Sequence, residues 1–235
     1  MQAFSNLSSA AHYFLFIVLV FIPAMGVIGY FRLRSGKPLR PKRQRYISII
    51  VVQSFLLLLT LKAAQDEGIE LLGRSWGNSV TWSCLITFLV LVALRLPRAW
   101  RKLPRERLEK ARRLLPDDPL LMRLWTGIAA MAGISEECAY RGLLFRLLLH
   151  MGWSIEMALV ICVATFAIGH MTQGWRGVVG TAVLAIIFHS IVIFGNSLYP
   201  AILLHAVYNL MVGIVAMPVL SKFAKEQELT QTAQA

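Results

Sequence analysis

The sequence predicts an all-α protein, a polytopic transmembrane helical bundle of seven spans, or eight if one long segment is broken. Hydrophobic residues make up 57% of the 235 positions and charged residues only 15%. A water-soluble domain of this length would carry more charge. The apolar residues also gather in runs close to the ~20 residues that a helix needs to cross about 30 Å of hydrocarbon. Composition and run length together indicate a multi-pass membrane protein.

The predicted spans are the long apolar runs of the sequence. They are residues 12–30, 46–64, 80–96, 120–149, 155–171, 177–194 and 198–217. No basic residue precedes the first run and no small-x-small cleavage site ends it, so we expect a retained span and not a signal peptide. The run 120–149 would measure about 43 Å as one straight helix. That length is enough to contain a bend, which would make two spans of it.

The net charge of +12 is concentrated between predicted spans. Seven Lys or Arg and no acidic residue lie in 32–45, and nine Lys or Arg against two acidic residues lie in 95–113. Basic loops stay on the cytoplasmic side of a membrane. Loops 32–45 and 97–119 are therefore predicted to be cytoplasmic, with the N-terminus and loop 65–79 outside. We expect a cell-membrane protein whose basic loops contact anionic lipid headgroups, and nucleic acid is excluded as a partner.

The distribution of polar groups divides the chain into three parts. Residues 1–119 hold three N-terminal spans with basic cytoplasmic loops and almost no polar groups inside the spans. Residues 120–217 hold all the intramembrane charge, so any chemistry is expected there. Residues 218–235 are a polar C-terminal tail that we expect to be frayed. The segment "LPRERLEKARRLL" has helical spacing, which predicts an amphipathic cytoplasmic helix at the membrane interface.

Three ionisable residues lie within six positions of one predicted span, in "GISEECAYRG". An ionised side chain at the centre of a membrane helix costs about 2.5–3.5 kcal/mol on insertion scales. Glu137 and Arg141 are four residues apart, so they can neutralise each other on one helix face. Glu136 points about 100° away from Glu137 around the helix axis. It therefore needs another partner or a water-filled cavity.

Polar side chains on two later spans can supply that partner. "FAIGH" places Phe166 and His170 four residues apart, and "HAVYN" does the same for His205 and Asn209, so each pair shares a helix face. A Glu and a His can share a water whose proton the carboxylate takes during attack on a carbonyl. A His and an Asn can both donate to the oxygen that becomes negative. Alternatively, two His and one Glu can hold zinc with a position open for water.

Other intramembrane protease mechanisms are excluded by the residues that the sequence lacks. Asp occurs only at positions 66, 117 and 118, all in predicted loops, so a pair of aspartates within the membrane is impossible. Neither HExxH nor GxSxG occurs, which leaves hydrolysis by a glutamate. His189, in "IIFHS", is more simply explained by a hydrogen bond to a neighbouring helix than by a catalytic role.

The motifs EExxxR in "EECAYR", FxxxH in "FAIGH" and HxxxN in "HAVYN" occur in this order on successive predicted spans. Each motif alone is weak, but the ordered set is specific. Over residues 120–215 the chain resembles the CAAX protease and bacteriocin-processing family. These intramembrane glutamic proteases include the type II CAAX prenyl endopeptidases. The first three spans match the family only as generic membrane helices.

The resemblance implies a role for each motif residue. Glu136 would activate water with the aid of His170, and His205 and Asn209 would form the oxyanion site. The supporting residues Glu137 and Arg141 would hold the geometry. No cofactor is expected in this version of the mechanism. In the alternative, zinc would be held by Glu136, His170 and His205.

The resemblance implies an endopeptidase with its catalytic core in residues 120–217. It would cut near the C-terminus of a membrane-associated peptide or of a lipidated, for example prenylated, protein. Two readings compete with it: a non-catalytic membrane binding or bacteriocin-immunity-type protein, and a small transporter with Glu136 as proton relay. Straight, upright helices would hold His170 and His205 too far apart to share a substrate. Short, tilted helices, or a dip of residues 172–176 into a cavity, would bring them together.

Overall fold

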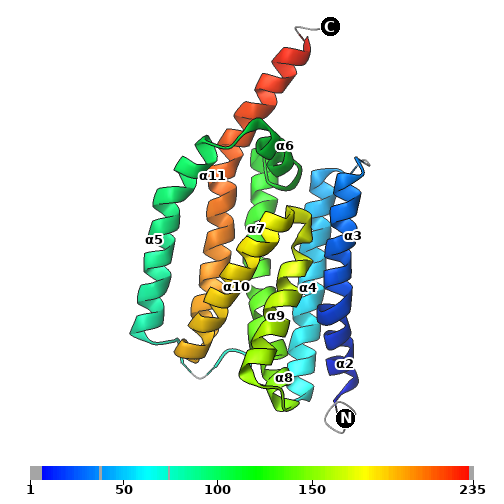
Figure 1. The fold of residues 1–235 in the computed structure, drawn as a ribbon, viewed down its shortest axis with the longest axis vertical. Coiled ribbons are helices and arrows are strands. Elements are labelled where there is room, and N and C mark those ends of the chain that lie inside the picture. The colour runs from blue at the N-terminus through cyan, green and yellow to red at the C-terminus, as the bar shows by residue number, and fades with distance from the viewer. Residues whose placement is uncertain (1–6, 37–38, 74, 233–235) are drawn as a thin grey trace.

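The chain folds into a bundle of helices in the computed structural model, which describes residues 7–36, 39–73 and 75–232 (Figure 1). The parts of the predicted N-terminus, basic loop, outer loop and tail that fall on 1–6, 37–38, 74 and 233–235 lie outside the described residues. The elements are α2 (Ser9–Phe16), η1 (Ile17–Phe21), α3 (Ile22–Arg34), α4 (Lys42–Asp66), α5 (Ser79–Arg101), α6 (Arg105–Leu114), α7 (Pro119–Glu137), η2 (Cys138–Leu144), α8 (Phe145–His150), α9 (Ile155–Gly169), η3 (Met171–Gln173), α10 (Trp175–Gly195) and α11 (Tyr199–Thr232).

The predicted all-helical membrane fold is confirmed, and five of its predicted spans are helices long and apolar enough to cross a membrane within the described residues. They are Ser9–Arg34, Lys42–Asp66, Ser79–Arg101, Trp175–Gly195 and Tyr199–Thr230. The predicted span 155–171 is the shorter apolar helix α9. The predicted span 120–149 is the continuous helical path of α7, η2 and α8, which contains the charged EExxxR motif.

Polar residues set the beginnings of the helices that carry the candidate site. The Asp118 side chain accepts a hydrogen bond from the backbone N–H of Leu121 and caps α7, and Pro119 follows in the first turn, where its missing N–H costs nothing. The Ser154 side chain caps α9 in the same way by accepting from the N–H of Met157. These local signals fix where α7 and α9 start, and hence how far along each helix a given side chain lies.

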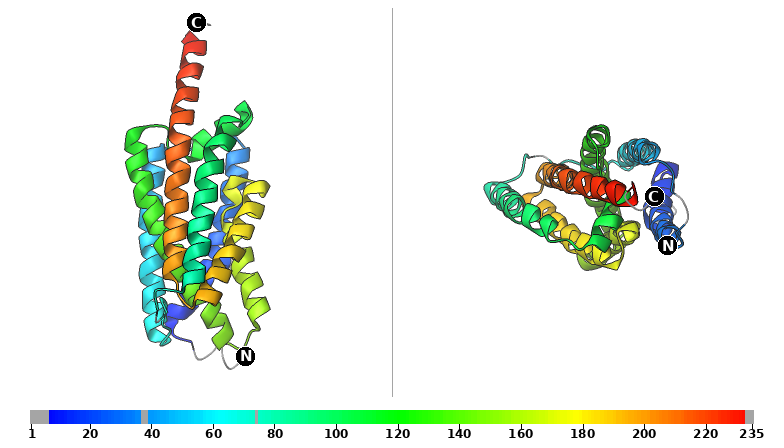
Figure 2. Two further views of the ribbon diagram at one scale, coloured as in Figure 1. Left: turned by 90° about the vertical axis from the view of Figure 1, so that its left-hand side faces the viewer. Right: turned by 90° about the horizontal axis from the view of Figure 1, so that it is seen from above.

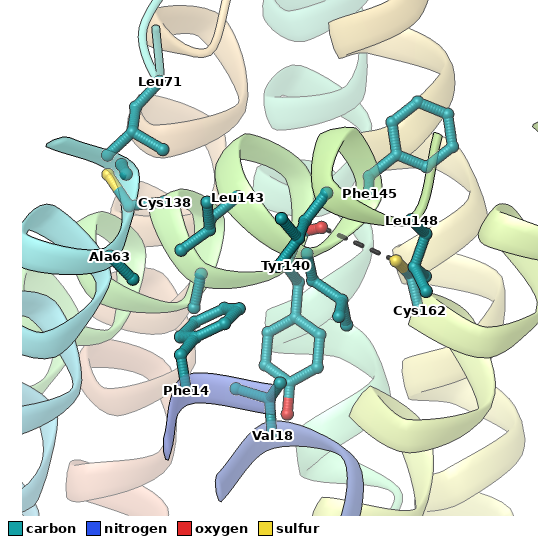
Figure 3. Close-up of a cluster of buried hydrophobic side chains, with 14 of the residues drawn as sticks. Phe14, Val18, Ala63, Leu71, Cys138, Tyr140, Leu143, Phe145, Leu148 and Cys162 are labelled. Carbon is teal, nitrogen blue, oxygen red and sulfur yellow. Dashed lines mark hydrogen bonds between the residues drawn. The ribbon is translucent and has the colours of Figure 1, made fainter. Parts of the chain in front are cut away.

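The EExxxR segment runs from α7 into a π-helical stretch, η2, of which every residue is buried. Single π-helical turns inside α-helices occur often at functional sites. The ring of Tyr140 lies beside Phe14 and Val18 of the N-terminal helices, and Cys162 Sγ of α9 donates to the Tyr140 carbonyl oxygen over 3.7 Å (Figure 3). The core therefore surrounds η2 on several sides and holds the helix immediately after the two glutamates.

The two basic segments lie at the same end of the bundle, and the α4–α5 connection lies at the other end (Figure 1). Lys42 pairs with Asp117 at 2.6 Å, and the Tyr46 hydroxyl donates to the Leu114 carbonyl oxygen at 2.8 Å. The two basic segments predicted to share one side of the membrane thus share one end of the bundle (Figure 1). The helix predicted in "LPRERLEKARRLL" is α6. Its Leu108 and Ala111 pack against the cluster around Trp100, so its apolar face covers protein.

The C-terminal segment differs from the frayed tail that the sequence predicts. Helix α11 continues to Thr232 and projects beyond the rest of the bundle (Figure 2). Phe223 is buried, the Ser221 hydroxyl donates to the Asp117 carbonyl oxygen, and Arg112 donates to Gln227 Oε1 at 2.8 Å. These contacts stabilise a helical continuation that polar composition alone did not indicate.

Candidate active site

Three side chains from three helices meet inside the bundle at the carboxylate of Glu136. Glu136 lies in the last turn of α7, His170 directly follows the last residue of α9 as its C-cap, and His205 lies in the second turn of α11. Oxygen Oε2 of Glu136 is 4.0 Å from His170 Nε2 and 3.8 Å from His205 Nε2. The same oxygen is buried and has no hydrogen-bond partner among the described residues. The tertiary fold thus brings together Glu136, His170 and His205.

Helix length explains why the two histidines lie at one depth. Helix α9 has 15 residues and ends at Gly169, which makes it about 22 Å long and too short to cross the hydrocarbon. Figure 1 shows it ending well below the upper ends of α4 and α11. His170 therefore lies inside the bundle. Short helices and a dip of residues 172–176 were the two explanations of how His170 and His205 could share a site. The structure supports the short helix.

Two glycines allow the helices to approach closely at this level. A Cβ atom on Gly133 would lie 2.8 Å from Ala206 Cβ and 3.0 Å from the Ile202 carbonyl oxygen, so α7 and α11 touch one turn before the glutamates. A Cβ on Gly26 of α3 would lie 2.5 Å from the Ile168 carbonyl oxygen, next to the end of α9. Small residues permit such close backbone packing in membrane helices. These contacts set the positions of Glu136 and His170.

Glu137 pairs with Arg141 as predicted, and it also binds His205. Its Oε1 accepts from Arg141 Nη1 at 3.2 Å and from His205 Nδ1 at 2.7 Å, and the side chains of Glu137 and Arg141 are fully buried. The Arg141 guanidinium also lies 4.5 Å from the centroid of the Phe166 ring, a cation–π contact. Glu137 therefore orients His205 in addition to neutralising Arg141.

The two imidazoles present the same ring nitrogen to Glu136 but have different partners behind them. His170 Nδ1 donates to the carbonyl oxygen of Phe166 at 2.8 Å, one turn earlier in the same helix. His205 Nδ1 donates to a carboxylate instead. With its proton on Nδ1, the imidazole of His170 can accept a hydrogen bond at Nε2. The two histidines thus differ in the group behind them, a backbone carbonyl for His170 and a carboxylate for His205.

Gln53 also belongs to the site. The sequence did not single it out, because the first three spans were expected to take no part in the chemistry. Gln53 lies on α4, and its Nε2 donates to Glu136 Oε1 at 2.5 Å. Its own Oε1 accepts from the hydroxyl of Ser135. The sequence signal that could have identified Gln53 is that it is the one amide side chain in the apolar run "IIVVQSFLLLL". A polar residue at the centre of a span usually has a specific partner.

Asn209 lies one turn beyond His205 on α11, half-buried. Its backbone carbonyl oxygen accepts from Trp125 Nε1 at 2.8 Å. Among the described contacts its side-chain amide touches none of Glu136, His170 and His205. The arrangement of Asn209 as an oxyanion donor therefore stays a prediction.

His189 lies outside the site, although it is fully buried. Its Nδ1 donates to the carbonyl oxygen of Ala185 at 2.9 Å, and the ring packs edge-on against Phe145. The prediction that His189 bonds to a neighbouring helix is wrong, because the carbonyl oxygen that its Nδ1 binds belongs to its own helix, α10. The contact of His189 with Phe145 is a packing contact.

The described residues contain no group of three or more His, Cys, Asp or Glu side chains arranged to hold a metal ion. Zinc–ligand bonds of about 2.0–2.2 Å in a tetrahedron would place ligand atoms about 3.4 Å apart. The measured separations from Glu136 Oε2 are 4.0 Å to His170 Nε2 and 3.8 Å to His205 Nε2. A zinc ion held by these three residues would require them to move closer together.

The comparison with known families agrees with the geometry. A family model described as type II CAAX prenyl endopeptidase Rce1-like matches residues 118–211, which contain all three motifs. No curated protein and no solved structure matches the chain. The predicted resemblance is thus confirmed over the part that supplies Glu136, His170 and His205. Residues 118–211 of this chain are similar to the Rce1-like type II CAAX prenyl endopeptidases.

Proposed function

We propose that the protein is an intramembrane endopeptidase that hydrolyses a peptide bond near the C-terminus of a membrane-associated substrate. One observation carries the proposal. A carboxylate and two imidazoles from three helices converge within 4.0 Å, with Glu136 Oε2 facing both Nε2 atoms. The match to a protease family supports a hydrolytic role for this group.

Glu136 and His170 would activate the attacking water. An oxygen and a nitrogen 4.0 Å apart can both accept hydrogen bonds of about 2.8 Å from one water between them. Glu136 Oε2 would take a proton from this water while the water oxygen bonds to the scissile carbonyl carbon. The carboxylic acid formed on Glu136 would then give the proton to the leaving amide nitrogen as the C–N bond breaks. The products are a carboxylic acid and an amine.

His205 would stabilise the negative oxygen of the tetrahedral intermediate. Because its Nδ1 already donates to Glu137, its Nε2 can donate only when the ring is protonated. The Asn209 amide, one turn away, would be the second donor.

We propose an apolar or lipidated C-terminal segment as the substrate, with prenylated proteins as one class. The family description supports this choice. The position of the site supports it as well, because Glu136 and the two histidines lie among apolar helices and a greasy chain would reach them from the bilayer. The cell membrane, with the basic loops on the cytoplasmic side, is the proposed location.

Cleavage of a quenched, lipidated C-terminal peptide by the purified protein tests the proposal. We expect Glu136→Gln and His170→Ala to abolish cleavage. Matched controls are Glu156→Gln and His150→Ala, which alter exposed residues outside the site. A wild-type protein that cleaves no peptide from a broad lipidated panel would favour the binding or immunity-type reading. Flux in liposomes driven by a pH gradient and dependent on Glu136 would favour the transporter.

A zinc-dependent protease using the same residues is the second candidate, because both Nε2 atoms point at one carboxylate oxygen. Dialysis of the active protein against a strong chelator separates the two mechanisms. Retained cleavage supports the metal-free glutamate, and loss of cleavage that added zinc restores supports the metal enzyme.

A further inference from the structure

We propose that Gln53 is a positioning residue that orients the Glu136 carboxylate. The proposal rests on the proposed function and extends its machinery to α4. Gln53 lies outside the region matched by the family model, residues 118–211. It is separated from Glu136 by 83 positions in the sequence. It is therefore a contribution of the N-terminal half to the site.

The Gln53 amide is held at both ends by consecutive residues of α7. Its Nε2 donates to Glu136 Oε1 at 2.5 Å, and its Oε1 accepts from the hydroxyl of Ser135, which is fully buried. Rotation of the amide by 180° would point its oxygen at a carboxylate oxygen, where two acceptors repel each other. One amide orientation therefore satisfies both neighbours.

This contact gives the two carboxylate oxygens of Glu136 different partners. Gln53 occupies Oε1, and Oε2 is left facing His170 and His205. Hydrogen bonds donated to a carboxylate are about twice as strong as neutral ones. The Gln53 contact therefore holds the carboxylate in the orientation in which Oε2 faces the two histidines.

Packing between α4 and α7 keeps the contact in place. Tyr46 of α4 is buried in a cluster with Leu121 and Ile128 of α7, and Ile50 packs against that cluster. Ile50 lies one turn before Gln53 on α4, and Tyr46 lies two turns before it. The first half of the chain is thus a structural part of the site and more than a membrane anchor.

Substitution of Gln53 by Met keeps the length and the apolar shape but removes the donor. We expect kcat to fall about 10- to 100-fold, the loss expected for a hydrogen bond to a charged group, with KM little changed. A loss confined to kcat separates lost positioning of the carboxylate from lost substrate binding. The matched control is Gln65→Met on the exposed end of α4.

Ser135→Ala gives a second, independent test. It releases only the far end of the amide, so its loss of kcat should be smaller and in the same direction. The double variant should be no slower than Gln53→Met alone, because both changes act through one contact. Full additivity in this cycle would overturn the proposal. A rise in KM in Gln53→Met as large as its fall in kcat would do the same, since it indicates general distortion of the site.

Infrared spectroscopy of the Glu136 carboxylate tests the contact without a substrate. Its stretching bands are identified by their disappearance in Glu136→Gln. Loss of the hydrogen bond to Oε1 should shift these bands in Gln53→Met relative to the wild type, and unchanged bands would overturn the proposal. A wild type that cleaves nothing would remove the proposed function and leave this comparison decisive for Gln53. If Gln53→Met does not fold, Ser135→Ala carries the same measurement.

Discussion

Glu137 holds His205 through a 2.7 Å hydrogen bond between Oε1 and Nδ1, across 68 positions of sequence. The same oxygen accepts from Arg141, four residues further along the chain. A residue that pairs locally with an arginine on its own helix thus also orients an imidazole on another helix. The second glutamate of EExxxR connects the scaffold to the site.

We predict that Glu137→Gln lowers kcat about 10- to 100-fold, the loss expected for a hydrogen bond to a charged group. The carboxylate holds His205 by accepting from its Nδ1 at 2.7 Å, and an amide at the same position would hold the ring less firmly. Glu156→Gln alters an exposed carboxylate outside the site and is the control. Cleavage rates measure the effect, and a kcat equal to that of the wild type would show that Glu137 does not orient His205 during the reaction.

Arg141→Met is expected to lower the free energy of unfolding by about 3–5 kcal/mol, because it leaves a buried carboxylate without its guanidinium partner. The Phe166 ring would also lose its cation–π contact. Denaturant titration in detergent measures the change. Lys110→Met removes an exposed (i, i+4) pair with Glu106 and should leave stability almost unchanged. Equal stability of the two variants would contradict the structural role of the buried pair.

Gly133→Ala should separate α7 from α11 and reduce both stability and kcat. Its methyl group would lie 2.8 Å from Ala206 Cβ, and overpacking of this kind costs about 1–3 kcal/mol. Gly180→Ala is the matched control, since a Cβ there meets no atom within 4 Å. Thermal unfolding and cleavage rates measure both changes. A Gly133 variant as active and stable as the Gly180 variant would show that α7 and α11 need not touch this closely.

Asn209→Leu is expected to lower kcat about 10²- to 10³-fold, the loss typical of one oxyanion donor, while the melting temperature stays close to that of the wild type. Removal of an interaction made only in the transition state lowers kcat without raising KM. His189→Gln alters a buried polar residue outside the site and should leave kcat nearly unchanged. Cleavage by Asn209→Leu at the wild-type rate would remove this residue from the mechanism.

The sequence by itself determined the membrane class, the placement of both basic segments at one end of the bundle (Figure 1) and the residues of the three motifs. Each of these depends on neighbours in the chain. Apolar runs and loop charge are read over about 20 residues, and the Glu137–Arg141 pair follows from four-residue spacing on one helix. The requirement that Glu136 have a partner also followed from the cost of burying it.

Only the tertiary structure decided which groups surround Glu136. Gln53 carries no periodic signal, and its partner lies 83 positions away. The depth of His170 depends on where α9 ends, and the bond from His205 to Glu137 depends on the close approach that Gly133 allows. The helical extension of α11 to Thr232 depends on its contacts with α6 and the following loop. Packing between distant segments fixed these features, because local spacing places side chains on a helix face but does not choose which helix lies opposite.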